Sequence, residues 1–510
     1  MALALALLAA SPLVAAQKPN VYSDMHWREI GPTRGGRARA LAGVPSQPNV
    51  FYAGYDNGGV WRSTDYGSTW VPLFDHEPTS SIGAIAVAPS NPDIIYVGTG
   101  AGIIRPDLST GDGMYKSTDA GRTWTHLGLR DSQMIADIDV DPTNPDRLFV
   151  AALGHPYGPN AERGIFRSTD GGRTFQKVLY HDAYTSGNDV VIDPANPQIV
   201  YAALWQQQQS FREGPEFGGS GEGNGIYKST DGGTTWQKLT TGLPSVIQAN
   251  LALAPGNPNV VYAMVAGTAE PFTGVGSGED PTTTGLIGLY KSTDAGAHWT
   301  AVDVPAGLAG ATSHFDRRPL LRIGGGDLPT LAVDPKNENV VYSASTVMWR
   351  SDDGGAHWTA VRGAYGGDDY QKIWINPDNP DIILVVSDQG AVVSANGGKS
   401  WSNWYTQPTA AMYHVSTDDA FPYRVCGGQQ DSGSACVKSR SNDGMITFHD
   451  WHPVNIQEYG IAAPDPKNPN LVYGSARNDV TLYNRTTGQT TRVGPDMGPF
   501  GGPYNRDVRT

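Results

Sequence analysis

Residues 63–70 read Ser-Thr-Asp-Tyr-Gly-Ser-Thr-Trp, and the same pattern recurs six more times along the chain. Its general form is Ser-x-Asp-x-Gly-x-(Thr/Ser/His)-aromatic, and the later copies begin at Ser117, Ser168, Ser229, Ser292, Ser351 and Ser394. Successive copies start 43 to 63 residues apart, a period typical of the blades of a β-propeller. The repeat therefore predicts an architecture before any single residue is considered, and it predicts no chemistry.

Each copy follows a second repeated pattern, of which residues 82–100 and 135–153 are examples. An alternating apolar run meets a Pro-x-Asn-Pro turn and then a second apolar run, which predicts strand, turn and strand. A third strand ends at the signature serine and a fourth begins at its Thr-Trp, so the signature is the turn between them. In such a turn Asp accepts backbone N–H bonds, Gly permits positive φ and the aromatic ring packs underneath. The signature aspartates and tryptophans are therefore expected to be structural.

Four-stranded units at this spacing predict an all-β protein, a seven-bladed β-propeller followed by the start of a second propeller. The signature is lost after its seventh copy, which gives expected domains of 17–409 and 410–510. Residues 26–31 resemble a lone fourth strand with no obvious mate in the sequence. We therefore expect a truncated chain.

Composition excludes some partners and indicates a compartment. The chain of 510 residues has a formal net charge of −14 and no basic cluster, so a nucleic-acid partner is not expected. Residues 1–16 are apolar and end in small residues, as in a signal peptide, and are too short to span a membrane. A secreted or periplasmic protein is expected, and there Cys426 and Cys436 are expected to form a disulfide across one hairpin.

The signature turns are Asp boxes, also called bacterial neuraminidase repeats. The chain resembles secreted bacterial proteins of the sortilin-like, "glycosyl hydrolase, BNR repeat" group and is similar, more distantly, to the two-propeller xyloglucanases. This resemblance covers nearly the whole mature chain. It is specific for the fold but weak for function, because the Asp box occurs in proteins of unrelated activity.

Long loops point to one face of the propeller as the functional face. The loops between second and third strands are long in units two to five, at 100–113, 154–164, 206–225 and 266–288, and the stretch 302–328 is also long. Long loops gathered on one face form a groove or rim. Drift of insertions without a function is the alternative.

Three turns between second and third strands share the form Asp-x-Gly, at Asp56, Asp388 and Asp431. Residues 52–59, Tyr-Ala-Gly-Tyr-Asp-Asn-Gly-Gly, match the xyloglucanase segment that carries one catalytic Asp, and Asp431 is the closest counterpart of the second. The resemblance thus implies Asp56 and Asp431 as the two carboxylates of a glycoside hydrolase. The surroundings of Asp431 do not otherwise reproduce the family pattern, and ordinary Asx turns remain the alternative for all three.

Other residues on the expected functional face are candidates for substrate contact. Aromatic side chains stack on the apolar faces of sugars, and polar ones can donate or accept hydrogen bonds. The candidates are Tyr157, Trp205, Phe211, Phe217, Asp327, Asp368, Gln429 and Gln430. Packing within loops and solvated turns are the alternatives for them. No His-x-His or His-Glu-x-x-His pattern occurs, so neither a metal nor another cofactor is expected.

Three functions remain open from the sequence. The first is a glycan-binding or glycoside-hydrolase-like protein that acts on polysaccharide in a groove built from loops. The second is a sortilin-like propeller that binds peptides or proteins without catalysis. The third is an assembly scaffold. The separation of the Asp56 and Asp431 carboxylates is the feature that would best discriminate among them.

Overall fold

The structure is a computed structural model in which antiparallel sheets follow one another along the chain. It describes residues 22, 25–103, 109–206, 208–209, 215–216, 221–267, 287–304, 320–321, 327–363, 369–476 and 479–494. Within these residues eight sheets have four strands, one has three, and a two-stranded ribbon lies in a loop. The predicted all-β class and the propeller-type sheets are confirmed. No helix of this part of the chain is long and apolar enough to cross a membrane.

The first four sheets use strands in chain order. They are β1 (Ala38–Gly43), β2 (Phe51–Tyr55), β3 (Gly59–Ser63) and β4 (Val71–Pro72); β5 (Ile82–Val87), β6 (Ile95–Thr99), β7 (Met114–Ser117) and β8 (Thr125–Gly128); β9 (Ile135–Val140), β10 (Leu148–Ala152), β11 (Gly164–Ser168) and β12 (Gln176–Leu179); and β13 (Thr185–Ile192), β14 (Val200–Gln206), β17 (Gly225–Ser229) and β18 (Gln237–Leu239), with β15 (Gln208–Gln209) and β16 (Pro215–Glu216) forming the ribbon.

The remaining sheets continue the same order. They are β19 (Val246–Leu253), β20 (Val261–Gly267), β21 (Ile287–Ser292) and β22 (Thr300–Ala301); β23 (Thr330–Asp334), β24 (Asn337–Ala344), β25 (Met348–Ser351) and β26 (Thr359–Arg362); β27 (Tyr370–Ile375), β28 (Ile383–Ser387) and β29 (Gly390–Ser394); β30 (Ser416–Thr417), β31 (Arg424–Gln429), β32 (Gly433–Lys438) and β33 (Trp451–His452); and β34 (Ala462–Pro464), β35 (Leu471–Ala476), β36 (Asp479–Asn484) and β37 (Gln489–Arg492). Two short 3-10 turns, η1 (Arg130–Ser132) and η3 (Trp404–Thr406), are the helical elements described.

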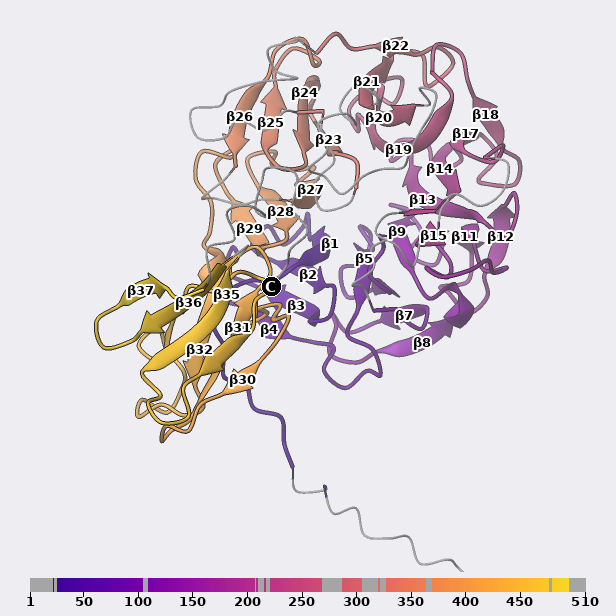
Figure 1. Ribbon diagram of the computed structural model, residues 1–510. Helices are drawn as coiled ribbons and strands as arrows, with labels where there is room; N and C mark the ends of the chain where they lie inside the picture. The colour runs from indigo at the N-terminus through magenta and orange to yellow at the C-terminus, as the bar shows by residue number, and fades with distance from the viewer. Residues whose placement is uncertain are drawn as a thin grey trace, which may run out of the picture.

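The first seven sheets are arranged in a ring (Figure 1). Each first strand contacts the first strand of the next sheet, from β1 through β5, β9, β13, β19 and β23 to β27, and β27 in turn contacts β1. The first and seventh sheets share one apolar cluster that includes Phe51, Trp61, Leu384 and Val386. The last two sheets lie beside the ring, and β34 contacts both β30 and β31.

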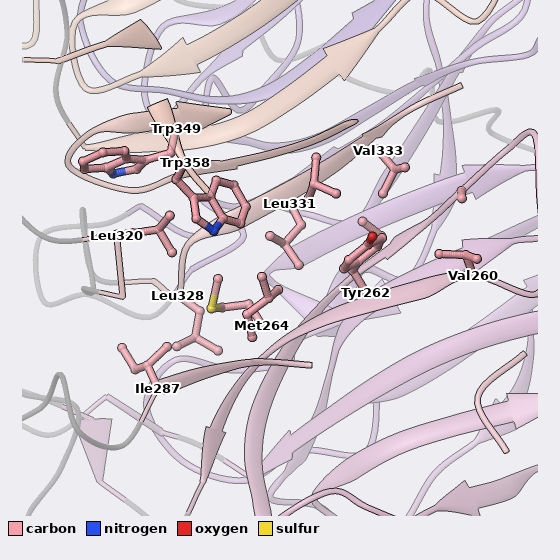
Figure 2. Packing of buried hydrophobic residues seen from close by; sticks show 14 of the residues in the cluster. Val260, Tyr262, Met264, Ile287, Leu320, Leu328, Leu331, Val333, Trp349 and Trp358 are labelled. Atoms are coloured by element: carbon pink, nitrogen blue, oxygen red, sulfur yellow. The ribbon is translucent and has the colours of Figure 1, made fainter. Parts of the chain in front are cut away.

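Apolar side chains fill the spaces between neighbouring sheets. Figure 2 shows the cluster between the fifth and sixth sheets, where Tyr262 and Met264 of β20 face Leu331, Trp349 and the signature residue Trp358. Hydrogen bonds also connect neighbouring sheets, because buried tyrosines on the second strands donate to backbone carbonyls of the following sheet. These pairs are Tyr52 with Ala120, Tyr96 with Pro145, Tyr201 with Ala295 and Tyr262 with Glu338.

The signature turn is held by its own side chains. In the first copy the Ser63 hydroxyl donates to Asp65 Oδ1 at 2.9 Å and accepts from the Gly67 amide at 2.9 Å. Asp65 accepts from the Thr69 amide at 2.8 Å and from its hydroxyl at 2.6 Å. Gly67 has φ of 79°, which a glycine adopts without strain. Trp70 is buried and donates to the Gly67 carbonyl.

The same network recurs in the other copies. Hydrogen bonds from the residue four positions on lower the pKa of the signature aspartate to about 2 in Asp119, Asp170, Asp294 and Asp353. Asn396 of the seventh copy keeps the geometry, because its Oδ1 accepts from the Ser400 amide at 2.9 Å. Trp299 and Trp358 are buried like Trp70, whereas Trp124, Trp236 and Trp401 are half-buried. The structural role predicted for the signature is confirmed.

Two predictions for the N-terminal part of the chain are not confirmed: one is wrong, and the other concerns residues that the structure does not describe. Residues 26–31 do not form a strand, and Trp27 among them is fully exposed. Their resemblance to a fourth strand is one of sequence alone, since the seventh sheet has three strands and gains no fourth from these residues. The expected signal peptide, 1–16, lies outside the described residues.

We expect Asp65→Ala to lower the free energy of unfolding by about 1–2 kcal/mol, because the turn loses a carboxylate that accepts several hydrogen bonds. Chemical unfolding measures this change. Asp75→Ala is the control, since Asp75 is an exposed carboxylate on the loop after the first sheet. Equal stability of the two variants would contradict a structural role for Asp65.

Candidate functional site

The three Asp-x-Gly turns meet at one place, although they belong to the first, seventh and eighth sheets. Asp56 follows β2, Asp388 follows β28 and Asp431 follows β31. Arg37 lies between the first two: its Nε is 3.5 Å from Asp56 Oδ2, and its Nη2 is 2.8 Å from Asp388 Oδ2. Carboxylate oxygens of Asp388, Asp431 and Asp369 lie within 4.8 Å of one another. We call Arg37 and these four aspartates the carboxylate cluster.

Strand order fixes the face on which this cluster lies. Asp56 follows the second strand of its sheet, whereas the signature residue Asp65 follows the third. Adjacent strands are antiparallel, so the two turns stand at opposite ends of the sheet. The carboxylate cluster is therefore at the end of the sheets away from the signature turns.

The inner part of the cluster is buried, and one arginine, Arg37, contacts both of its carboxyl groups. Arg37 donates to Asp388 through both Nε, at 3.0 Å, and Nη2, at 2.8 Å. Asp388 also accepts from Gln430 Nε2 at 2.7 Å. A charge removed from water is tolerated when it is paired and hydrogen-bonded, which describes Asp388. Both carboxylate oxygens of Asp56 are buried as well, and one of them lies 3.5 Å from Arg37 Nε.

Asp431 is the most exposed member of the cluster, although its carboxyl group is itself crowded by neighbouring atoms. Its pKa is raised to about 6, first because neighbouring atoms displace water from its carboxyl group and then because Asp369 and Glu458 carry like charge. A hydrogen bond with Asp388 and the charge of Arg37 oppose this rise. Asp431 has φ of 48°, and its amide donates to Glu458 Oε2 at 3.1 Å. The turn thus presents a carboxyl group that changes its charge near pH 6.

A second buried network adjoins the first. Arg39, on β1, donates to Asp327 Oδ2 at 2.7 Å and to Gln371 Oε1 at 2.7 Å. Asp327 also accepts from Gln248 at 2.6 Å. Gln371 Nε2 lies 3.3 Å from Asp388 Oδ1 and joins the two networks. Asp327 therefore has structural partners, and its predicted contact with substrate stays a prediction.

The hairpin that carries Asp431 is braced from several sides. Cys426 and Cys436 are directly opposite each other on β31 and β32 and form the predicted disulfide. Gln429 is fully buried and donates to the Gly35 carbonyl at 2.9 Å. With Gln430 bound to Asp388, both predicted glutamines serve to fix the hairpin. Their proposed contact with substrate stays untested.

The remaining predicted residues are dispersed. Trp205 is buried at the end of β14, where its ring is not presented to solvent. Tyr157 is exposed, on a loop that the buried Arg163 orders by donating to Asn160 Oδ1 and to the His155 carbonyl. Phe211, Phe217 and Asp368 lie outside the described residues. The structure therefore brings Asp56, Asp431, Gln430 and Asp327 into one connected region, without Trp205.

One group among the described residues has the spacing of a metal site, and it is Asp369, Asp388 and Asp431. Asp388 already accepts bonds from Arg37 and Gln430. An acidic cluster alone does not identify a metal, so we assign none.

Sequence reasoning missed the arginines of residues 34–39 as parts of the site. Arg34, Arg37 and Arg39 are all buried. Their signal was the presence of three cations in a short run that leads into an apolar strand, where an arginine needs an acidic or carbonyl partner. The acidic partners that bind Arg37 and Arg39 through hydrogen bonds, Asp388 and Asp327, are 351 and 288 residues away, so no local pattern identified them.

Comparison with known proteins supports the fold and relates it to xyloglucanases. A family model described as Sortilin-Vps10 (sortilin, neurotensin receptor 3) matches residues 58–186 and 113–270. The xyloglucanase Xgh74A of Acetivibrio thermocellus is 24% identical over 62% of this chain and 37% of its own length. A xyloglucanase of a Paenibacillus species is 26% identical over 71% of this chain and 34% of its own. The chain thus spans little more than a third of these relatives.

Solved structures give the same fold relationship. The GH74 xyloglucanase of Xanthomonas campestris has a TM-score of 0.57 at 18% identity, covering 92% of this chain and 75% of that one. The GH74 enzyme of Niastella koreensis has a TM-score of 0.57 at 20% identity, covering 92% and 68%. At these identities the likeness concerns the fold alone.

Gly35→Ala should destabilise the protein by about 1–3 kcal/mol, because the added Cβ would lie 2.2 Å from the Gln389 carbonyl oxygen. Gly488→Ala is the control, since its φ is 69° but nothing lies within 4 Å of the added atom. Urea unfolding compares them. If Gly35→Ala lowered the free energy of unfolding less than Gly488→Ala, the close packing of the Gly35 backbone against Gln389 would not be needed for stability.

Proposed function

We propose that this Asp-box, sortilin-like β-propeller, which is distantly homologous to xyloglucanases, is an exported protein. In this proposal it binds and cleaves polysaccharide at the carboxylate cluster. The observation that carries the proposal is the difference between its carboxyl groups. Asp431 is exposed with a pKa raised to about 6, whereas Asp56 and Asp388 are buried beside Arg37. Glycoside hydrolysis needs one carboxyl group that donates a proton and another that stays charged.

In this proposal Asp431 protonates the leaving oxygen of the glycosidic bond. Its raised pKa keeps part of the population protonated near neutral pH, and its exposure lets a sugar approach. Asp56 is the charged partner. Because both carboxylate oxygens of Asp56 are buried, direct action of Asp56 requires the chain around it to open toward the sugar.

Xyloglucan is the first substrate to test, since the named relatives are xyloglucanases. The net charge of −14 favours a neutral polysaccharide over an anionic one. The functional face would hold the polysaccharide beside Tyr157, which is exposed and is one of the two predicted aromatic contacts that the structure describes.

Asp431→Asn should reduce the turnover of xyloglucan by about 10²–10⁴-fold, because the amide cannot donate a proton to the leaving group. Release of reducing ends measures turnover. Asp443→Asn, which replaces an exposed carboxylate of the same unit, should retain activity. Full activity of Asp431→Asn would remove the catalytic assignment.

The pH dependence of polysaccharide turnover by the wild-type protein tests the same role of Asp431 as proton donor. A proton donor with a pKa near 6 is lost as pH rises through that value, so kcat/KM should decline above about pH 6. A profile that stays flat from pH 5 to 8 would contradict Asp431 as the donor.

A sortilin-like peptide-binding propeller without catalysis is the second candidate. The family match over residues 58–186 and 113–270 favours it. For this candidate, the wild-type protein should not turn over polysaccharide. Its binding of ligand should also be independent of the protonation of Asp431.

We also propose that 17–409 and 410–510 are separate units, a seven-bladed propeller and the first blades of a second. The closed series of contacts from β1 to β27 supports the first unit. A separate apolar cluster with Cys426, Cys436, Val454 and Val472 supports the second.

Calorimetry tests this division. We expect two unfolding transitions, of which reduction of the disulfide lowers only one, because the crosslink constrains the second unit alone. The unreduced protein is the control. A single transition, or an equal shift of both, would contradict two units.

A further inference from the structure

Residues 33–37, Thr-Arg-Gly-Gly-Arg, run between the ring and the eighth sheet. The Gly35 amide donates to the Trp404 carbonyl at 3.0 Å, and the Thr409 amide lies 3.3 Å from the Arg34 carbonyl. The Gly36 amide donates to the Thr409 hydroxyl at 3.2 Å. The segment is therefore bound along its length by the connection that leads from the seventh sheet to the eighth.

The two glycines leave no room for movement. A Cβ on Gly35 would lie 2.2 Å from the Gln389 carbonyl oxygen, beside Asp388. A Cβ on Gly36 would lie 2.2 Å from the Thr409 carbonyl oxygen. The backbone of the segment is thus packed directly against the backbone of its neighbours, which makes it a rigid spacer between its two arginines.

Arg34 holds the turn that presents Asp431. Its Nη1 donates to the Ser432 carbonyl, and its Nη2 donates to the Ser434 carbonyl at 2.9 Å. Its guanidinium also lies 4.9 Å from the centre of the Trp451 ring. Arg34 is buried and bonds to the two residues that flank the glycine of the Asp431 turn, which fixes the position of that turn.

Arg37 holds the other side of the cluster. Its guanidinium is fixed by two hydrogen bonds to Asp388 and lies 3.5 Å from Asp56. Asp56 in turn donates its amide to the Arg37 carbonyl at 3.1 Å. Arg37 thus supplies both the position and the counter-charge of the buried carboxylates.

We propose that residues 33–37 form a positioning element in which Arg34 places the Asp431 turn and Arg37 places Asp56 and Asp388, so that one segment sets the geometry between the two candidate carboxyl groups. The functional meaning of this element rests on the function proposed above. Its physical content does not, because the protonation of Asp431 can be measured without any substrate.

The two arginines act on Asp431 in opposite ways. The charged groups that face Asp431 are Asp369, Asp388, Glu458 and Arg37. Arg34 affects it by keeping the turn among these groups, so loss of Arg34 should release the carboxyl group toward water. Arg37 affects it by its positive charge, so loss of Arg37 should favour the protonated form further.

The experiment is a pH titration of Asp431 by NMR of carboxyl-labelled aspartate, assigned with Asp431→Asn. In Arg34→Gln we expect the pKa of Asp431 to fall from about 6 toward the ordinary value of 3.8. In Arg37→Gln we expect it to rise above 6. Arg37→Lys keeps the positive charge, so the pKa of Asp431 should rise less in this variant than in Arg37→Gln.

Arg167→Gln is the matched control, since Arg167 also donates to a backbone carbonyl, that of Gly232, but beside a signature turn. It should leave the titration unchanged. If Arg37→Gln does not fold, Arg37→Lys carries the comparison, and the pKa of Asp431 should rise in it by a smaller amount, because the ammonium group cannot reproduce the two hydrogen bonds of the guanidinium to Asp388. Shifts of the same sign for Arg34→Gln and Arg37→Gln, or none beyond the control, would overturn the proposal. If the opposite shifts are found but the wild-type protein does not turn over polysaccharide, the proposed function alone is refuted.

Discussion

The carboxylate of the signature turn is the constraint on which the regularity of this protein depends. An aspartate such as Asp65 accepts hydrogen bonds from the serine two positions before it and from the residue four positions after it. It thereby closes the turn between third and fourth strands in one conformation. The same closure recurs in six copies, and an asparagine reproduces it in the seventh, so the turn after the third strand is alike throughout the ring, in which six of the seven sheets have four strands. Sheets of equal shape can pack side by side into a closed ring, and the interdigitating tryptophans and tyrosines then fill the spaces between them (Figure 2).

Ring closure also creates the site. When the seventh sheet packs against the first, the turns after β2 and β28 become neighbours, and their aspartates face the same arginine. Two carboxylates this close to each other would repel, and burial would add a large cost. Arg37 offsets both effects with two hydrogen bonds to Asp388 and a contact with Asp56. At Asp431 desolvation and the like charges of Asp369 and Glu458 outweigh the opposing effects of Asp388 and Arg37, so its pKa rises, whereas hydrogen bonds within the turn lower the pKa of a signature aspartate such as Asp119.

The centre of the ring shows a similar use of buried charge. Lys372 on β27 lies 3.5 Å from Asp137 on β9, and these strands belong to the seventh and third sheets. Burial and the neighbouring Asp137 raise the pKa of Asp189, and burial raises that of Asp139 to about 7. Charged side chains on the first strands thus meet across sheets that share no hydrogen-bonded strands. Apolar packing and hydrogen bonds thus join adjacent sheets, and the ion pair of Lys372 with Asp137 joins two that are not adjacent.

The sequence by itself determined whatever depends on contacts within a few residues. The seven signature turns, the alternating strands, the nine sheets and the pairing of Cys426 with Cys436 all follow from local spacing. It also singled out the three Asp-x-Gly turns, because their form is local. Only the tertiary structure decided that these turns converge, that Arg37 stands between Asp56 and Asp388, and that Asp431 alone among the three faces solvent. The physical reason is distance along the chain: Arg37 and Asp388 are 351 residues apart, and only closure of the ring brings such residues into contact.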